Sequence, residues 1–192
     1  MFGNRGGCLH TPAKRLSRRR WVTRRWITCV LEFRGRHREV MAPRRYTELF
    51  FLDEATAFAA GHRPCMECRR GDANRFIEAW STIHLPAGQR LRTVDQIDDL
   101  AHPQRIDTAT RHQHVSRAQL LALPDGVFVT LDEAPQQPLL LWRDRLHPWA
   151  YSGYARPISL PHDQPVTLLT PPSFAACFAA GYTPVVHSSA GS

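Results

Sequence analysis

Four side chains in the first seventy residues have the types and spacing that bind a metal ion. Cys65 and Cys68 follow Pro64 in the order Cys-x-x-Cys. Two thiolates at this spacing on a turn can hold one metal ion, and the spacing recurs in structural zinc sites. Cys8 and His10 form a second pair upstream, and zinc accepts both as ligands. A closed zinc site needs four donors, which the two pairs supply. The predicted Zn²⁺ ligands are Cys8, His10, Cys65 and Cys68.

Other residues are alternatives to this set. His62 lies three residues before Cys65 and can replace His10 as a ligand, and His37 is a further substitute. Cys29 falls on the apolar face of a predicted strand, where a small buried core residue is the usual role of cysteine. It is also a substitute for His10 as the fourth ligand. Free thiols or a redox pair are the alternative to a metal site, but no thioredoxin-like strand–helix unit surrounds the Cys-x-x-Cys pair.

The elements around this pair can be predicted from local patterns. Residues 46–52 favour an extended segment that leads into a short helix. Asp53 can cap that helix, because its carboxylate accepts amide protons of the first turn. Residues 54–60 are good helix formers, and Gly61 stands where a helix ends. A second helix is predicted over residues 72–81.

This part of the sequence resembles a known family. An aromatic strand (Phe50-Phe51), an Ala-rich helix (Asp53 to Ala60) and a Gly-x-Arg-Pro-Cys-x-x-Cys turn (Gly61 to Cys68) stand in that order. In this respect residues 46–70 resemble the N-terminal metal-binding domain of the Ada family of bacterial DNA alkylation-repair proteins. The resemblance extends loosely back to Cys8 and ends near residue 80.

The resemblance implies a zinc ion held by thiolates and an upstream cysteine that accepts a methyl group from a DNA phosphotriester. Cys65 and Cys68 match the family's ligands. The family's upstream Cys-x-x-x-Cys pair is replaced here by Cys8-Leu9-His10. Three thiolates and a neutral histidine leave less negative charge on zinc than four thiolates, so Cys8 should be less nucleophilic. We therefore expect a structural site, which would also stabilise the fold.

Basic residues are concentrated at one end of the chain. Residues 1–45 hold 13 Lys and Arg against 2 Asp and Glu, a charge of +11, and the remainder carries −3. Such a block indicates an anionic partner, with nucleic acid first. Because only Lys14 is a lysine, a GC-rich genome is an alternative cause of the arginine bias. The predicted nucleic-acid contacts are Arg18, Arg19, Arg20, Arg24 and Arg25.

The rest of the chain predicts an α+β fold of a small zinc module and a mixed β-rich lobe. The module would span residues 1–82, with a β-hairpin over residues 21–41, and a polar connector would span residues 83–114. The β-rich lobe would span residues 115–192. Within that lobe, the patterns predict short helices at 118–122 and 174–180, and strand-like segments at 127–131, 139–143, 166–170 and 184–187.

Three classes of function fit these features. The leading hypothesis is a zinc-stabilised protein that contacts nucleic acid in DNA repair or regulation. The second is an enzyme, either a metal-dependent phosphodiesterase using residues between His102 and His114 or an alkyl acceptor using Cys8. The third is a structural zinc protein with a protein partner. Without a signal peptide or an apolar run long enough to span a bilayer, a cytoplasmic protein with no membrane partner is expected.

Overall fold

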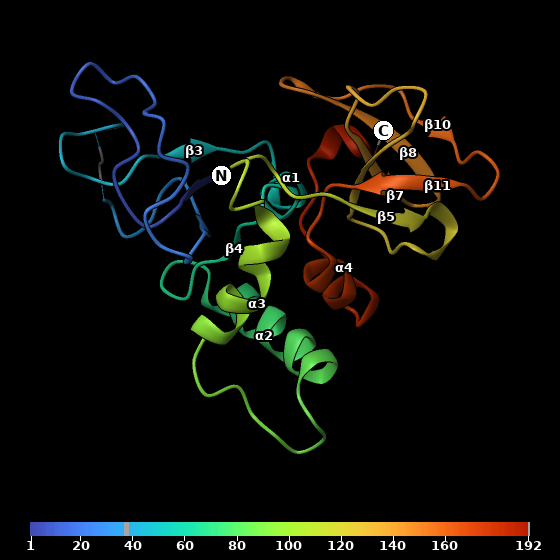
Figure 1. Cartoon of the computed structure of the whole chain (residues 1–192), viewed down its shortest axis with the longest axis horizontal. Helices are drawn as coiled ribbons and strands as arrows, with labels where there is room; N and C mark the ends of the chain where they lie inside the picture. The colour runs from blue at the N-terminus through green and yellow to red at the C-terminus, as the bar shows by residue number, and fades with distance from the viewer. Residues whose placement is uncertain (37–38, 192) are drawn as a thin grey trace.

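Helices and two β-sheets make up the computed structural model, which describes residues 1–36 and 39–191 (Figure 1). This confirms the predicted α+β class. The α-helices of the described residues are α1 (Glu54–Ala59), α2 (Arg70–His84), α3 (Asp95–Arg105) and α4 (Pro172–Ala179). Two short 3-10 helices follow β5 and precede the C-terminus, at Leu120–Ala122 and Ser188–Ala190.

The first sheet holds the N-terminal part of the chain. Its strands are β1 (Phe2–Asn4), β2 (Ile27–Cys29), β3 (Leu49–Phe50) and β4 (Arg63–Pro64). They lie in the order β3-β1-β2-β4. β1 is antiparallel to both of its neighbours, whereas β4 runs parallel to β2. A parallel pair needs a long crossover connection, which here contains β3 and α1.

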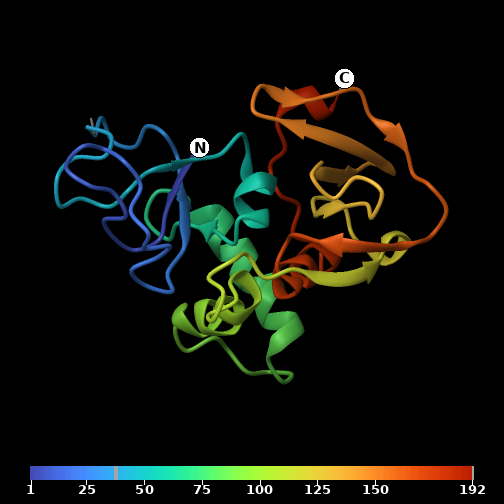
Figure 2. The same ribbon diagram turned by 45° about the horizontal axis from the view of Figure 1, so that its top comes forward.

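The second sheet is antiparallel throughout and holds the C-terminal part. Its main order is β10-β8-β7-β6-β11-β5, and β9 pairs with β8 beside this path. The strands are β5 (Ser116–Gln119), β6 (Phe128–Thr130), β7 (Leu139–Trp142), β8 (Arg145–Ala150), β9 (Gly153–Tyr154), β10 (Ile158–Ser159) and β11 (Pro165–Leu168). Figure 2 shows the two sheets on opposite sides of α1 and α2.

Acidic residues at the start of α1 attach the C-terminal segment to the first half of the chain. Asp53 caps α1 through the amide of Thr56, at 2.8 Å, as predicted. Its other carboxylate oxygen accepts from the hydroxyl of Tyr154 at 2.7 Å and from the amide of His187 at 2.9 Å. The next residue, Glu54, is also buried and accepts from the hydroxyl of Tyr182.

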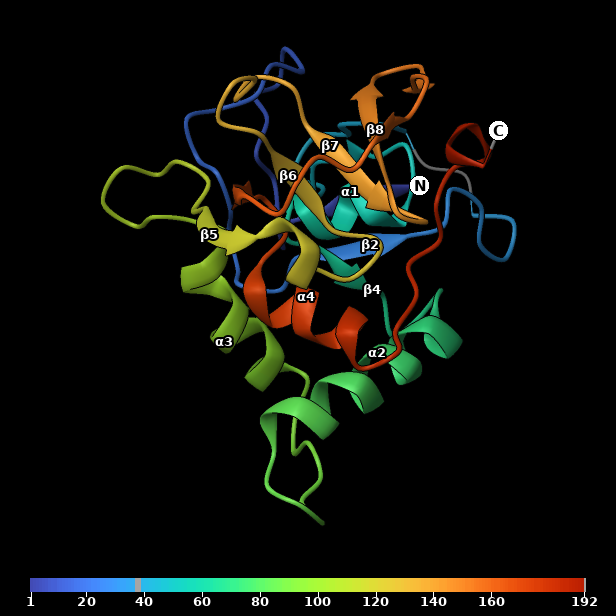
Figure 3. The same cartoon turned by 90° about the vertical axis from the view of Figure 1, so that its right-hand side faces the viewer.

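The main hydrophobic core lies where α2, α3 and α4 pack below the second sheet (Figure 3). Aromatic rings dominate it. The Phe58 ring of α1 lies 5.2 Å from Phe76 of α2 and 5.5 Å from Phe174 of α4, measured between centroids. Buried residues from all three predicted segments contribute to this core, including Ile97 and Leu120. The division of the chain near residues 82 and 114 stays a prediction.

Several predicted elements are confirmed and others are wrong. The strand-like segments at 127–131, 139–143 and 166–170 correspond to β6, β7 and β11, and the helices α1, α2 and α4 lie where predicted. The hairpin over 21–41 is wrong, because β2 is the strand of its described part and pairs with β1 and β4.

Two predictions in the last third also differ from the structure. The helix at 118–122 is replaced by β5 and a 3-10 turn, because residues 116–119 pair with β11. Residues 184–187 form no strand, and a 3-10 helix follows them. Among the residues that the structure describes, no helix is long and apolar enough to cross a lipid bilayer.

Candidate metal centre

The parallel pairing of β2 and β4 brings two cysteines side by side. In this pairing Ile27 lies opposite Arg63 and Thr28 lies opposite Pro64. The amide of Cys65 donates to the carbonyl oxygen of Thr28 at 2.9 Å, so the register continues to the next residues. Cys29, the last residue of β2, and Cys65, the first residue after β4, therefore lie side by side.

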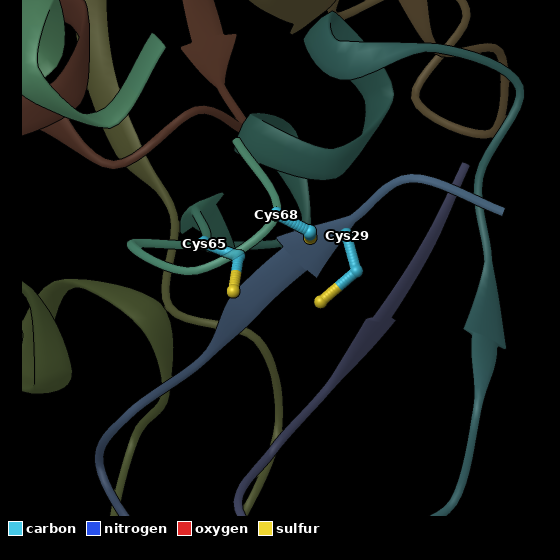
Figure 4. Close-up of side chains that lie close together, drawn as sticks. All are labelled: Cys29, Cys65 and Cys68. Carbon is cyan, nitrogen blue, oxygen red and sulfur yellow. The ribbon is translucent and has the colours of Figure 1, made fainter. Parts of the chain in front are cut away.

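A tight turn adds the third cysteine. The amide of Arg69 donates to the carbonyl oxygen of Cys65 at 3.0 Å, and α2 begins at the next residue. The turn folds Cys68 back toward the two strand ends. The side chains of Cys29, Cys65 and Cys68 gather at this place (Figure 4).

The three sulfur atoms lie within 4.8 Å of one another. Zn–S bonds of about 2.3 Å place two sulfurs of a tetrahedral site about 3.8 Å apart, so this trio needs only a small adjustment to bind one ion. Cys29 and Cys65 are buried, and Cys68 is half-buried. The cluster packs against Phe2 of β1 and is shielded from solvent on that side. This group of three thiols could hold a metal ion.

Protons are unevenly shared in the cluster. The Cys29 thiol donates to Cys65 and lowers the pKa of Cys65 to about 5, and amides of the turn add to this effect. The same hydrogen bond, together with burial, raises the pKa of Cys29. Burial raises the pKa of Cys68 as well. Cys65 is thus the first thiolate, and metal binding would release the protons of the other two.

The structure brings together two of the four predicted ligands and places the other two elsewhere. Cys65 and Cys68 meet Cys29, and among residues 1–36 and 39–191 this trio is the only such group of three or more potential ligands. Cys8 lies instead beside His10, with its sulfur 3.7 Å from Nε2. His10 is buried, and its Nδ1 lies 2.6 Å from the hydroxyl oxygen of Thr47. Ligand roles for Cys8 and His10 stay predictions.

Of the two histidines that could replace His10 as a ligand, only His62 is among the described residues. His62 is fully buried between the rings of Trp26 and Phe51, at centroid distances of 5.5 and 4.8 Å. Its Nε2 lies 3.4 Å from Nε of Arg5, so His62 belongs to a basic cluster and not to the cysteine trio. His37 lies outside the described residues.

The sequence favoured a core role for Cys29 and left it as a substitute for the fourth ligand. Its burial fits that reading, but its sulfur faces two other sulfurs. The strand pattern alone cannot reveal this, because the partner strand β4 is only two residues long and comes from beyond α1. The one available signal was that Cys29 is a third cysteine in the same N-terminal part of the chain as the Cys-x-x-Cys pair.

The five arginines predicted to bind nucleic acid fall into two groups. Arg18, Arg19 and Arg20 are exposed and line a shallow pocket with Arg111. Arg24 and Arg25 are also exposed, but they pair with carboxylates of α3. Arg24 lies 2.8 Å from Asp99, and Arg25 holds Asp95 with two hydrogen bonds of 2.7 Å.

Among the described residues, the carboxylates and histidines of the hypothetical hydrolytic centre (Asp98 to His114) form no group of three that could hold a metal ion. Asp98 is buried and forms ion pairs with Arg63 at 2.6 Å and Arg105 at 3.1 Å. His102 is buried, whereas His112 is exposed. Asp98 is therefore engaged as the counter-charge of two buried arginines.

Comparison with known proteins adds no further constraint, since no protein-family model, curated protein or solved structure matches the chain.

Proposed function

We propose that the chain is a zinc protein whose structural metal centre is built on Cys29, Cys65 and Cys68. The observation that carries the proposal is the convergence of three sulfurs within 4.8 Å from two strand ends and one turn. Buried thiols in such an arrangement suit zinc, which prefers sulfur and nitrogen donors in a tetrahedron. A fourth donor completes the site, and the sequence offers Cys8, His10 and His37 for it.

The position of the centre supports a structural role. It lies at the end of β2, the end of β4 and the start of α2. The pairing of β2 with β4 is only two residue pairs long. An ion bound there would fix the two-residue strand β4 against β2. Such a centre stabilises the folded state directly, because the unfolded chain has no preformed site.

The nucleic-acid part of the proposal rests on the basic N-terminal surface. Arg18, Arg19 and Arg20 project from a loop that contributes no strand to either sheet, and no carboxylate lies within ion-pair distance of them among the described residues. Together with the Ada-like turn, this favours a module that contacts DNA or RNA in repair or regulation. A structural zinc protein with a protein partner is the competing class.

Metal content tests the proposal. We expect about one zinc per chain in the purified protein, and its loss when Cys29, Cys65 or Cys68 is changed to Ala. Cys177→Ala is the matched control, because Cys177 is also a buried free cysteine but lies in the main core, away from the trio. Zinc retained in Cys29→Ala, or absent from the wild type, would contradict the proposal. The variants Cys8→Ala, His10→Ala and His37→Ala identify the fourth donor.

A further inference from the structure

A second site, beside the end of α1, contains no cysteine. It is a cavity of about 260 Å³ whose wall includes Arg5, Arg20, Arg105 and Arg111. The remaining lining residues, Trp26, Ala60, Ile106, His112 and Gln113, carry no carboxylate. A cavity with four arginines and no acidic residue in its wall has a strongly positive potential.

Arg5 holds its position by stacking. Its guanidinium carbon lies 3.9 Å from the centroid of the buried Trp26 ring. Its N–H groups reach only Nε2 of His62 and the carbonyl oxygens of Ala60 and Arg20, each at 3.4 Å. These are long hydrogen bonds, and no carboxylate of the described residues forms an ion pair with Arg5. Its donors are thus largely available to a ligand.

Arg105 is the second deep cation. Its side chain is 0% exposed, and its guanidinium carbon lies 5.3 Å from the centroid of Trp26. One terminal nitrogen donates to Asp98 at 3.1 Å and the other to the carbonyl oxygen of Arg24 at 2.8 Å. Nε of Arg105 is buried without a hydrogen-bond partner.

The charges in this region do not balance. The carboxylate of Asp98 pairs with Arg105 and also accepts a hydrogen bond of 2.6 Å from Arg63. Among the described residues, the single carboxylate of Asp98 thus serves both Arg63 and Arg105, and Arg5 has no paired carboxylate. Burial lowers the pKa of Arg5 to about 10 and that of Arg105 to about 10, so both stay cationic at neutral pH. Burying unpaired cations is costly, and an anion bound in the cavity would offset that cost.

A second cavity adjoins the first. It has a volume of about 540 Å³ and shares Ala60 and Gln113 with the arginine cavity. Its wall is mainly apolar and aromatic, with Phe50, Trp149 and Tyr151 among its residues. The Tyr151 side chain is 93% exposed, and its ring lies edge-on to Trp149 with a centroid distance of 4.9 Å. Exposed aromatic rings beside a basic groove are suited to stacking on a base.

We propose that the two cavities form one nucleotide site, in which the arginine cavity binds a phosphate monoester and the aromatic cavity holds the base. Guanidinium groups bind phosphate with paired, charge-assisted hydrogen bonds, and a terminal phosphate carries more charge than an internal phosphodiester. The ligand is thus a mononucleotide or the 5′-terminal nucleotide of a strand. The site needs no metal ion and goes beyond the proposed zinc centre.

Binding of AMP, adenosine and inorganic phosphate to the purified protein, measured by titration calorimetry, tests the proposal. We expect AMP to bind at least about tenfold more tightly than adenosine, because adenosine lacks the phosphate. Arg5→Met keeps an unbranched apolar side chain but removes the guanidinium, and it should weaken AMP binding about tenfold or more. Arg111→Ala removes an exposed lining residue and should also weaken AMP without affecting folding.

Two further variants separate the cavities. Tyr151→Ala should weaken AMP but leave inorganic phosphate unchanged, whereas Arg156→Ala, an exposed arginine outside both cavities, should change neither. Equal affinity for AMP and adenosine, or AMP binding unaffected by both Arg5→Met and Arg111→Ala, would overturn the proposal. Tighter binding of a 5′-phosphorylated oligonucleotide than of AMP would identify the strand end as the source of the phosphate. Zinc content has no part in these outcomes, so they are independent of the metal test.

Discussion

The amide of Cys65 donates a hydrogen bond to the carbonyl oxygen of Thr28 at 2.9 Å, although the two residues are separated by β3 and α1 in the chain. This contact extends the parallel pairing of β2 and β4 by one step and sets Cys65 beside Cys29. The Gly61–Arg69 segment then serves both candidate sites. Its two cysteines, Cys65 and Cys68, join Cys29 in the thiol trio, and its first residues pack on Arg5 and Arg105 of the arginine cavity.

The buried carboxylate of Asp98 should be essential for stability. Asp98→Asn leaves Arg63 and Arg105 buried without a counter-charge, and we expect a loss of about 3–5 kcal/mol in the free energy of unfolding. Asp99→Asn is the matched control, because Asp99 forms an exposed pair with Arg24 whose loss costs about 0–1 kcal/mol. Urea denaturation measures both changes. Similar losses in the two variants would contradict the assignment.

Gly61 should tolerate no side chain. Its φ is +80°, and a Cβ there would lie 2.7 Å from Cγ of Arg105. Gly88 has a φ of +79° with no atom near the added carbon, so Gly88→Ala isolates the backbone cost, about 1–2 kcal/mol. We expect Gly61→Ala to destabilise the protein more than Gly88→Ala and to weaken phosphate binding as Arg105 shifts. Thermal unfolding and calorimetry would reveal this, and equal destabilisation would contradict it.

Stability should fall below about pH 6.5, the ordinary pKa of histidine. Burial and the positive charges of Arg5 and Arg105 lower the pKa of His62 well below that value, so the folded state keeps His62 neutral. The unfolded chain binds the proton first, and stability present above pH 6.5 is lost as pH decreases. One such histidine contributes up to about 1.4 kcal/mol per pH unit.

The measurement for this prediction is the free energy of unfolding at pH 7.5, 6.5 and 5.5. His62→Gln should reduce the decrease between pH 6.5 and 5.5, while the exposed His112→Gln should not. Protonation of the cysteine trio affects all of these proteins alike and does not alter the comparison. An unchanged pH dependence in His62→Gln would argue against a neutral buried histidine.

The predicted nucleic-acid contacts should be unequal. Arg18 and Arg19 are free of ion pairs among the described residues, whereas Arg24 and Arg25 are held by α3. The double change of Arg18 and Arg19 to Ala should lower DNA affinity and reduce the slope of log K against log salt by about 0.7–0.9 per arginine. The same change at Arg24 and Arg25 should have a smaller effect. Filter binding or anisotropy at several salt concentrations compares the pairs, and equal slopes would refute the distinction.

Local signals in the sequence predicted the elements that depend on neighbours in the chain. Asp53 caps α1 and Gly61 ends the following turn, because capping and a positive φ are decided within a few residues. The parallel pairing of β2 with β4 could not be predicted, since two-residue strands carry no periodic pattern. The predicted hairpin was wrong for the same reason: the partners of β2 come from far along the chain.

The same difference between local and long-range signals applies to the candidate metal site. The Cys-x-x-Cys spacing identified Cys65 and Cys68 as neighbours, because a single turn brings them together. Cys29 joins them only through the register of β2 and β4, which is a tertiary feature. Likewise, Arg5 and Arg105 meet at Trp26 only in the folded chain, so no local sequence pattern predicts the arginine cavity.

The short pairing of β2 with β4 has a consequence for the order of folding. Closing the chain segment between β2 and β4 costs conformational entropy, and this cost grows with segment length. A pairing of only two residue pairs offsets little of it. An ion captured first by the adjacent Cys65 and Cys68 offers Cys29 a strong bond on each encounter. The zinc ion would then act as a nucleus that closes this loop early, and refolding would be faster with zinc present than after chelation.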